Sequence, residues 1–99
     1  MNSAQIRTLR GDILQFLYNI GSSNASESSI IQAYYEYYKP EDIRRALSYL
    51  KDSGLIICEE RNHPVYKLMK EKFYHIAPSG MDLVDGTIEN PGIAVVTES

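Results

Sequence analysis

The first part of the chain carries apolar residues spaced three and four positions apart from Ala4 to Ile20. These offsets predict an amphipathic helix with a single buried stripe. Gly21 is expected to end the helix, because glycine adopts the left-handed conformation of a helix C-terminus without steric cost. Gly11 weakens the helix interior relative to alanine, and the close approach of another backbone would explain its presence. The predicted stripe consists of Ile6, Leu9, Ile13, Phe16, Leu17 and Ile20.

A loop of small and polar residues separates this helix from a second one, which we expect from about Glu27 to Tyr37. Two pairs of residues are suited to cap its N-terminus, Asn24 with Glu27 or Ser26 with Ser29. The side chains expected to face inward are those of Ile30, Ile31, Ala33, Tyr34 and Tyr37.

A third helix is predicted to begin at Pro40, because the missing N–H of proline is harmless in the first helical turn. Glu41 and Asp42 follow at the positive end of the helix dipole. Ser53 and Gly54 are expected to end the helix. Its predicted buried stripe consists of Ile43, Ala46, Leu47 and Leu50.

The hydrophobic period changes after the third helix. Leu55–Cys58 and Lys72–Ala77 are short runs typical of β-strands, and the mostly polar stretch Glu59–Glu71 joins them into a hairpin. Pro78–Val84 predicts a short last helix. For the tail at residues 87–99 we expect a frayed terminus in preference to a strand added to the sheet of a partner chain.

The predicted order is three helices, a two-stranded hairpin and a short C-terminal helix. This describes a mainly α fold with a small β-hairpin, of the α+β class. It is also the order of elements in a winged helix-turn-helix domain, in which the hairpin is the wing. We expect one such domain over residues 1–86, followed by a C-terminal tail over residues 87–99.

Two stretches of the chain resemble the winged-helix regulators of the ArsR/MarR-like group. The first, Asp42–Leu47 continuing to Gly54–Ile56, is similar to their third helix and the step into the wing. The second, Tyr74–Met81, is similar to their exit from the wing into a last helix. Ala77 stands where this group has a capping threonine, so that cap is either lost or shifted to Ser79.

The C-terminal pattern narrows the resemblance. Gly80–Val84, Gly86 and Pro91–Ile93 are similar to the ending of the short winged-helix proteins of Mu-like prophages, which are often labelled ArsR-like. The resemblance implies a transcriptional regulator that binds double-stranded DNA as a homodimer. Winged helices also serve as protein-binding modules, so the alternative is a protein-interaction or assembly module without DNA binding.

The composition further limits the classes of protein to which the chain can belong. With 99 residues the chain is expected to form one domain, and 43% hydrophobic with 23% charged residues is typical of a folded protein. The longest apolar runs have four residues, whereas a membrane span needs about 20. The N-terminus has no apolar stretch of secretory type. Because Cys58 is the only cysteine, no internal disulfide can form, and we expect a cytoplasmic protein.

The charges are unevenly placed along the chain. The net charge is −3, from 10 basic and 13 acidic residues. Residues 39–75 hold eight of the basic and six of the acidic residues, so this stretch carries +2 and the remainder −5. The positive stretch covers the third helix and the hairpin, which is the direction that a DNA-binding surface requires. An ordinary hairpin with solvated lysines would give the same count.

The third helix is the element that would enter the major groove in a helix-turn-helix protein. Its outward face also carries Glu41 and Asp52, which would repel phosphates. The side chains expected to contact DNA are Arg44, Arg45, Ser48, Tyr49 and Lys51 on this helix and Arg61, Lys67 and Lys70 on the wing.

The chain contains eight tyrosines, and four of them fall between Tyr34 and Tyr38. Around one helix these side chains cannot all point into a small core. Tyrosine is enriched at protein interfaces because it is large, rigid and amphipathic. A homodimer interface through Tyr34, Tyr35 and Tyr38 is one interpretation, and tyrosines lying over the surface of their own domain is the other.

Motifs for catalysis, cofactors and metals are missing from the sequence. The chain has no glycine-rich phosphate loop, nucleophile elbow or His-Glu-x-x-His motif. Cys58 falls in an apolar run, where thiols are usually inert, and His63 and His75 are far apart on the hairpin. We therefore expect no enzymatic activity, no cofactor and no metal site.

Overall fold

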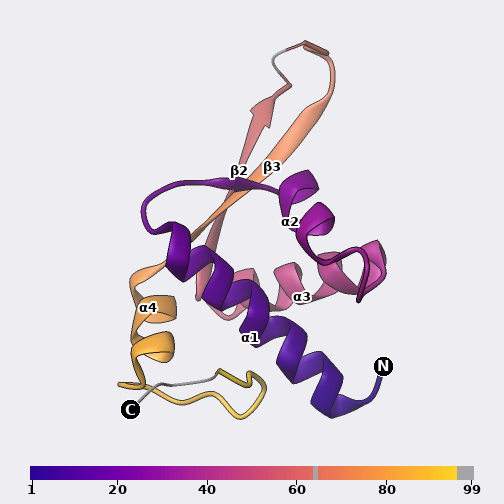
Figure 1. The fold of residues 1–99 in the computed structure, drawn as a ribbon. Coiled ribbons are helices and arrows are strands. Elements are labelled where there is room, and N and C mark those ends of the chain that lie inside the picture. The colour runs from indigo at the N-terminus through magenta and orange to yellow at the C-terminus, as the bar shows by residue number, and fades with distance from the viewer. Residues whose placement is uncertain (64, 96–99) are drawn as a thin grey trace.

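Four helices and three strands are present in the computed structural model, which describes residues 1–63 and 65–95. Helix α1 crosses the molecule beneath the helix-turn-helix pair α2 and α3, and the hairpin of β2 and β3 projects away from the helices (Figure 1). In chain order the elements are α1 (Ser3–Ile20), β1 (Ala25–Ser26), α2 (Glu27–Tyr34), α3 (Pro40–Asp52), β2 (Ile56–Asn62), β3 (Lys70–Ile76) and α4 (Pro78–Asp85).

Helix α1 supplies one wall of the core. A capping box begins it, in which the Asn2 side chain accepts a hydrogen bond from the Gln5 N–H and the Gln5 side chain accepts one from the Asn2 N–H. Gly21 ends the helix with φ 66°, as predicted. Three members of the predicted stripe are buried, Leu9, Ile13 and Leu17, and the other three are partly buried. Leu14, which was not in the predicted stripe, is buried as well.

Helix α2 is shorter than predicted. The Ser26 hydroxyl caps it by accepting a hydrogen bond from the Ser29 N–H, which is one of the two expected capping pairs. The helix ends at Tyr34, where the Tyr37 N–H donates to the Tyr34 carbonyl in a tighter turn. The prediction that Ala33 and Tyr37 face inward is wrong: both are exposed, whereas Ile30 is buried.

Helix α3 begins at Pro40 and ends before Ser53, as predicted. All four side chains of its predicted stripe are buried. They pack with α1 and the base of the sheet into one core, whose largest fully buried side chains are Leu9, Ile13, Leu14, Leu17, Ile30, Ile43, Leu47 and Leu50.

The sheet has three antiparallel strands in the order β1-β3-β2, one strand more than predicted. Strand β1 pairs Ala25 with Tyr74 and Ser26 with Phe73, and its two residues are too few to show a period in the sequence. Strands β2 and β3 pair from Ile56 with Ile76 out to Asn62 with Lys70. The polar stretch Glu59–Glu71, predicted as a loop, is therefore strand at its two ends, Glu59–Asn62 and Lys70–Glu71.

Helix α4 lacks a side-chain cap at Ala77. Of the two alternatives for this position, the loss of the cap is confirmed. The shift to Ser79 is wrong, because the Ser79 hydroxyl donates to the Gly54 carbonyl at 2.7 Å. This bond and the one from the Ala77 N–H to the Leu55 carbonyl tie the start of α4 to the end of α3. Gly86 ends the helix in the left-handed conformation.

The segment after α4 packs on α1, and the expectation of a frayed terminus is wrong as far as residue 95. Ile93 is buried in the core, and the Ala94 N–H donates to the Arg7 carbonyl at 3.1 Å. A Cβ atom on Gly11 would collide with the Ala94 carbonyl oxygen, so the close backbone approach suggested by this glycine is confirmed. The rest of the tail, residues 96–99, lies outside the described residues, and the division at residue 86 stays a prediction.

Candidate nucleic-acid interface

One face of α3 points away from the core, because its apolar residues recur every three or four positions. Arg44, Arg45, Ser48 and Lys51 are exposed on this face, as a helix with that buried stripe requires. Glu41 and Asp52 are exposed there too. The outward surface of α3 is thus a mixture of cations, carboxylates and a hydroxyl.

Both arginines of this face have a carboxylate partner. Arg44 Nε lies 3.9 Å from Glu27 Oε2 at the start of α2, and Arg45 Nη1 lies 3.7 Å from Asp42 Oδ1 one turn earlier in α3. Exposed ion pairs of this kind contribute only about 0–1 kcal/mol. The two guanidinium groups can therefore exchange these partners for a phosphate or a base.

Tyr49 lies apart from the other predicted contacts on α3. The Arg10 guanidinium carbon lies 3.5 Å from the centre of the Tyr49 ring, and Arg10 Nη1 donates to the Gly92 carbonyl at 3.2 Å. The ring is half-buried between α1 and the C-terminal segment. The structure does not bring Tyr49 together with Arg44 and Lys51, which lie on the opposite flank of the helix.

The pairing of β2 with β3 divides the basic residues of the wing between its two faces. Directly opposed residues share a face of the sheet, and successive residues alternate. Asn62 with Lys70 and Glu60 with Lys72 therefore continue the face that packs on the helices at the base of the sheet. Lys72 was not among the predicted contacts, although its spacing of two from Lys70 would have identified it.

Arg61 lies on the other face of the wing. Its Nη2 donates to Glu59 Oε2 at 2.8 Å, and its guanidinium carbon lies 4.9 Å from the centre of the Phe73 ring. This hydrogen bond and the charge of Arg61 hold the pKa of Glu59 below its usual value. The structure therefore separates Arg61 from Lys70, with which it was grouped in the sequence.

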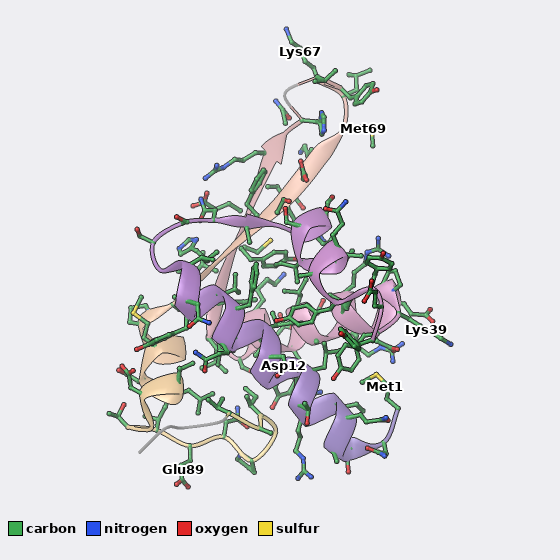
Figure 2. All side chains as sticks on the ribbon, in the orientation of Figure 1. Met1, Asp12, Lys39, Lys67, Met69 and Glu89 are labelled. Carbon is green, nitrogen blue, oxygen red and sulfur yellow. The ribbon has the colours of Figure 1, made fainter. Side chains whose placement is uncertain are left out.

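The N-terminus of α2 lies between α3 and the wing. Glu27, which pairs with Arg44, lines one groove together with Lys70 and Lys72. Lys67 lies farther out, at the turn of the hairpin, where Figure 2 shows it pointing away from the helices. A basic path thus runs from α3 past α2 to the wing, interrupted by carboxylates.

The tyrosines between residues 34 and 38 divide into inward and outward members. The Tyr34 hydroxyl donates to the Asp12 carbonyl at 3.0 Å, and its ring meets Phe16 edge-on at 6.3 Å. Burial is the main reason why the pKa of Tyr34 rises to about 12. Tyr38 is also partly buried, whereas Tyr35 is 61% exposed.

The groups considered for metal binding do not come together. Cys58 faces Tyr74 across the strand pair, and burial raises the pKa of that tyrosine. His75 pairs with Ile57 on the other face of the sheet, and His63 lies at the outer end of the wing. Within residues 1–63 and 65–95, no three His, Cys, Asp or Glu residues are grouped so that they could hold a metal ion.

Comparison of the sequence with protein-family models and with curated proteins gives no match. Among solved structures, the fold matches that of Bacillus subtilis PadR in complex with operator DNA, with a TM-score of 0.63 and 22% sequence identity. The match covers 92% of this chain and 54% of the PadR chain, so this chain spans about half the length of that protein. No helix of the described part of the chain is long and apolar enough to cross a membrane. The element order, the three-stranded sheet and this structural match together show that the chain has the winged-helix fold predicted from its sequence.

Proposed function

We propose that this chain binds double-stranded DNA and regulates transcription, with α3 in the major groove and the wing on the neighbouring backbone and minor groove. The observation that carries the proposal is the arrangement of Arg44, Lys70 and Lys72 around the N-terminus of α2. One duplex laid along α3 would reach all three. The likeness to PadR, which was solved with its operator DNA, supports this function.

The outward face of α3 offers chemistry for reading bases. Arg44 and Arg45 can each donate two hydrogen bonds to guanine, and Ser48 can bond to a base or a phosphate. Glu41 and Asp52 fit the same role, because a carboxylate accepts from the amino group of cytosine. Acidic side chains that contact bases lower non-specific affinity and favour the matching sequence.

A titration with a labelled random duplex tests DNA binding. Fluorescence anisotropy should give a dissociation constant of about 10⁻⁴–10⁻⁶ M at physiological salt, tighter at low salt. The double substitution Lys70→Ala with Lys72→Ala should reduce the slope of log affinity against log salt by about 2, since each phosphate contact contributes about 0.9. Arg7→Ala, a charge loss on an exposed residue of α1, is the control. No binding by the unaltered protein at low salt would contradict the proposal.

We further propose a homodimer, in which two copies of α3 would occupy half-sites about 34 Å apart. Tyr35 is the predicted interface residue that the structure leaves most exposed, whereas Tyr34 and Tyr38 pack on their own core. Sedimentation velocity should show a dimer that Tyr35→Ser weakens. Tyr66→Ser, which removes an exposed tyrosine from the wing, is the matched control. A monomer at all concentrations would contradict the proposed homodimer.

A protein-interaction module is the second candidate function. It is favoured by the net charge of −3 and by the exposed rings of Tyr35 and Tyr37 on the side of α2. The duplex titration separates the two candidates, because a module of this kind would show no salt-sensitive DNA binding. An origin in a Mu-like prophage stays a prediction of the sequence resemblance.

A further inference from the structure

The outer end of the wing exposes large apolar side chains within five consecutive positions. None of them packs on the core, and Figure 2 shows Met69 at the end of the hairpin, beyond the helices. A cluster of this kind marks a contact site more often than a single exposed apolar residue does. The exposed fractions are 72% for Val65, 63% for Tyr66, 101% for Leu68 and 61% for Met69.

Hydrogen bonds link His63 to described residues on the other side of this outer turn. The His63 N–H donates to the Met69 carbonyl at 2.8 Å, and the Met69 N–H donates to the Tyr66 carbonyl at 2.9 Å. His63 Nδ1 accepts from the N–H groups of Val65 and Tyr66, both at 3.1 Å. The imidazole also lies against the Tyr66 ring, with the ring centres 5.3 Å apart. Between these bonded residues, the Leu68 side chain is fully exposed to solvent.

The outermost charge of the wing is positive, which fits an anionic partner. Lys67 lies between the apolar residues and points away from the helices, whereas Glu27 and Glu71 line the groove on the helix side of the turn. The reach of the wing also fits a duplex. Each strand has seven residues and spans about 20 Å, comparable to the roughly 17 Å of half a helical turn that separates the major groove from the next minor groove.

We infer that Leu68, backed by Met69, is an apolar wedge that enters the DNA minor groove and partly unstacks a base step. Lys67 and Lys70 would hold the flanking phosphates. Apolar side chains inserted in this way kink the duplex toward the major groove by about 20–90°. Such a kink is easiest at pyrimidine–purine steps, so the wing would favour sites that contain them. This inference rests on the proposed DNA binding and adds bending to it.

A duplex that carries a fluorescence donor and acceptor at its two ends tests the wedge. The unaltered protein should raise energy transfer on binding, because a kink brings the ends closer together. Leu68→Ser should bind with a similar salt dependence and lose the rise in transfer. Ile88→Ser, which replaces an exposed apolar residue after α4, should behave like the unaltered protein.

The outcomes separate the wedge from DNA binding itself. Binding without a rise in transfer, or an equal rise with Leu68→Ser, would overturn the wedge and leave the proposed function in place. Absence of binding to any duplex would overturn both. Vesicles of phosphatidylserine and phosphatidylcholine test a lipid surface as the partner instead. The apolar turn would be assigned to a lipid surface if the unaltered protein bound the vesicles, Leu68→Ser abolished that binding, and the variant still bent DNA.

Discussion

Helix α3 and the wing, the two elements proposed to contact DNA, differ in the burial of their side chains and in the ion pairs of their cations. Helix α3 buries four side chains in the core, and each of its exposed arginines has a carboxylate partner. Among the described residues of the wing, none from Glu59 to Phe73 is buried, and Lys67, Lys70 and Lys72 form no ion pair there. The apolar side chains of its outer turn face solvent.

Under the proposed function, stability and DNA binding would depend on different residues of the chain. Substitutions on the buried side of α3 should unfold the protein and thereby lose binding. Substitutions on the outer wing should change binding alone, since no core contact depends on them. The paired arginines of α3 suit selective contacts, whereas the wing lysines suit attraction to any phosphate backbone.

The largest expected effect is on stability. Leu47→Ala should lower the free energy of unfolding by about 2–5 kcal/mol, because it opens a cavity under α3. Leu68→Ala, the same substitution on the wing, should change it by about 0.5 kcal/mol or less. Urea unfolding followed by circular dichroism measures both. Equal losses would show that the wing contributes to the core after all.

The next effect concerns the packing of the C-terminal segment against α1. Gly11→Ala should destabilise the protein by about 1–3 kcal/mol, because the new Cβ displaces Ala94. Helix propensity alone would stabilise it by about 1 kcal/mol. Thr8→Ala, on the exposed side of α1, is the control in which propensity acts with little packing change. A gain in stability with Gly11→Ala would contradict the described packing of residues 92–94.

A third effect separates specific from non-specific binding. Once a preferred duplex has been selected from a random pool, Arg45→Ala should weaken binding to it by about 1–3 kcal/mol and relax the sequence preference. Lys70→Ala should weaken binding to the selected and the random duplex by the same factor. If both variants lowered the two affinities equally, α3 would have no reading role.

The smallest expected effect tests whether the carboxylate partners restrain the arginines. Asp42→Asn releases Arg45 and should tighten binding to a random duplex by the equivalent of about 0.2–1 kcal/mol. Asp52→Asn removes the same charge from the other end of α3, where no ion pair is described. If Asp42→Asn tightens binding more than Asp52→Asn does, the difference measures how strongly the ion pair restrains Arg45. Equal gains in affinity would show that only the change in net charge matters.

The sequence predicted the helical part of the fold well, because the buried stripes of α1 and α3 repeat over several turns. It did not predict the end of α2 or the strand β1, which depend on a few local hydrogen bonds. The turn at Tyr34 ends α2 early, and β1 has only two residues with which to show a pattern. The packing of Ile93 depends on a contact with α1 that is distant along the chain.

The candidate site could be predicted only in part. The helical period placed Arg44, Arg45, Ser48 and Lys51 outward and Tyr49 on the opposite flank, whereas the contact of Tyr49 with Arg10 joins residues that are distant along the chain. On the wing, the register of β2 with β3 separates Arg61 from Lys70, and no register can be read from a single strand. The apolar turn was overlooked because it lies within a stretch that is mostly polar.

In the proposed complex, one duplex contacts both α3 and the wing. A titration of isotopically labelled protein with an unlabelled duplex, followed by amide chemical shifts, tests this residue by residue. We expect the shifts to change between residues 44 and 52 and between residues 61 and 72, and to change little in the middle of α1 and in α4. Changes confined to α1, α4 or the tyrosines after α2, or no changes at low salt, would contradict it.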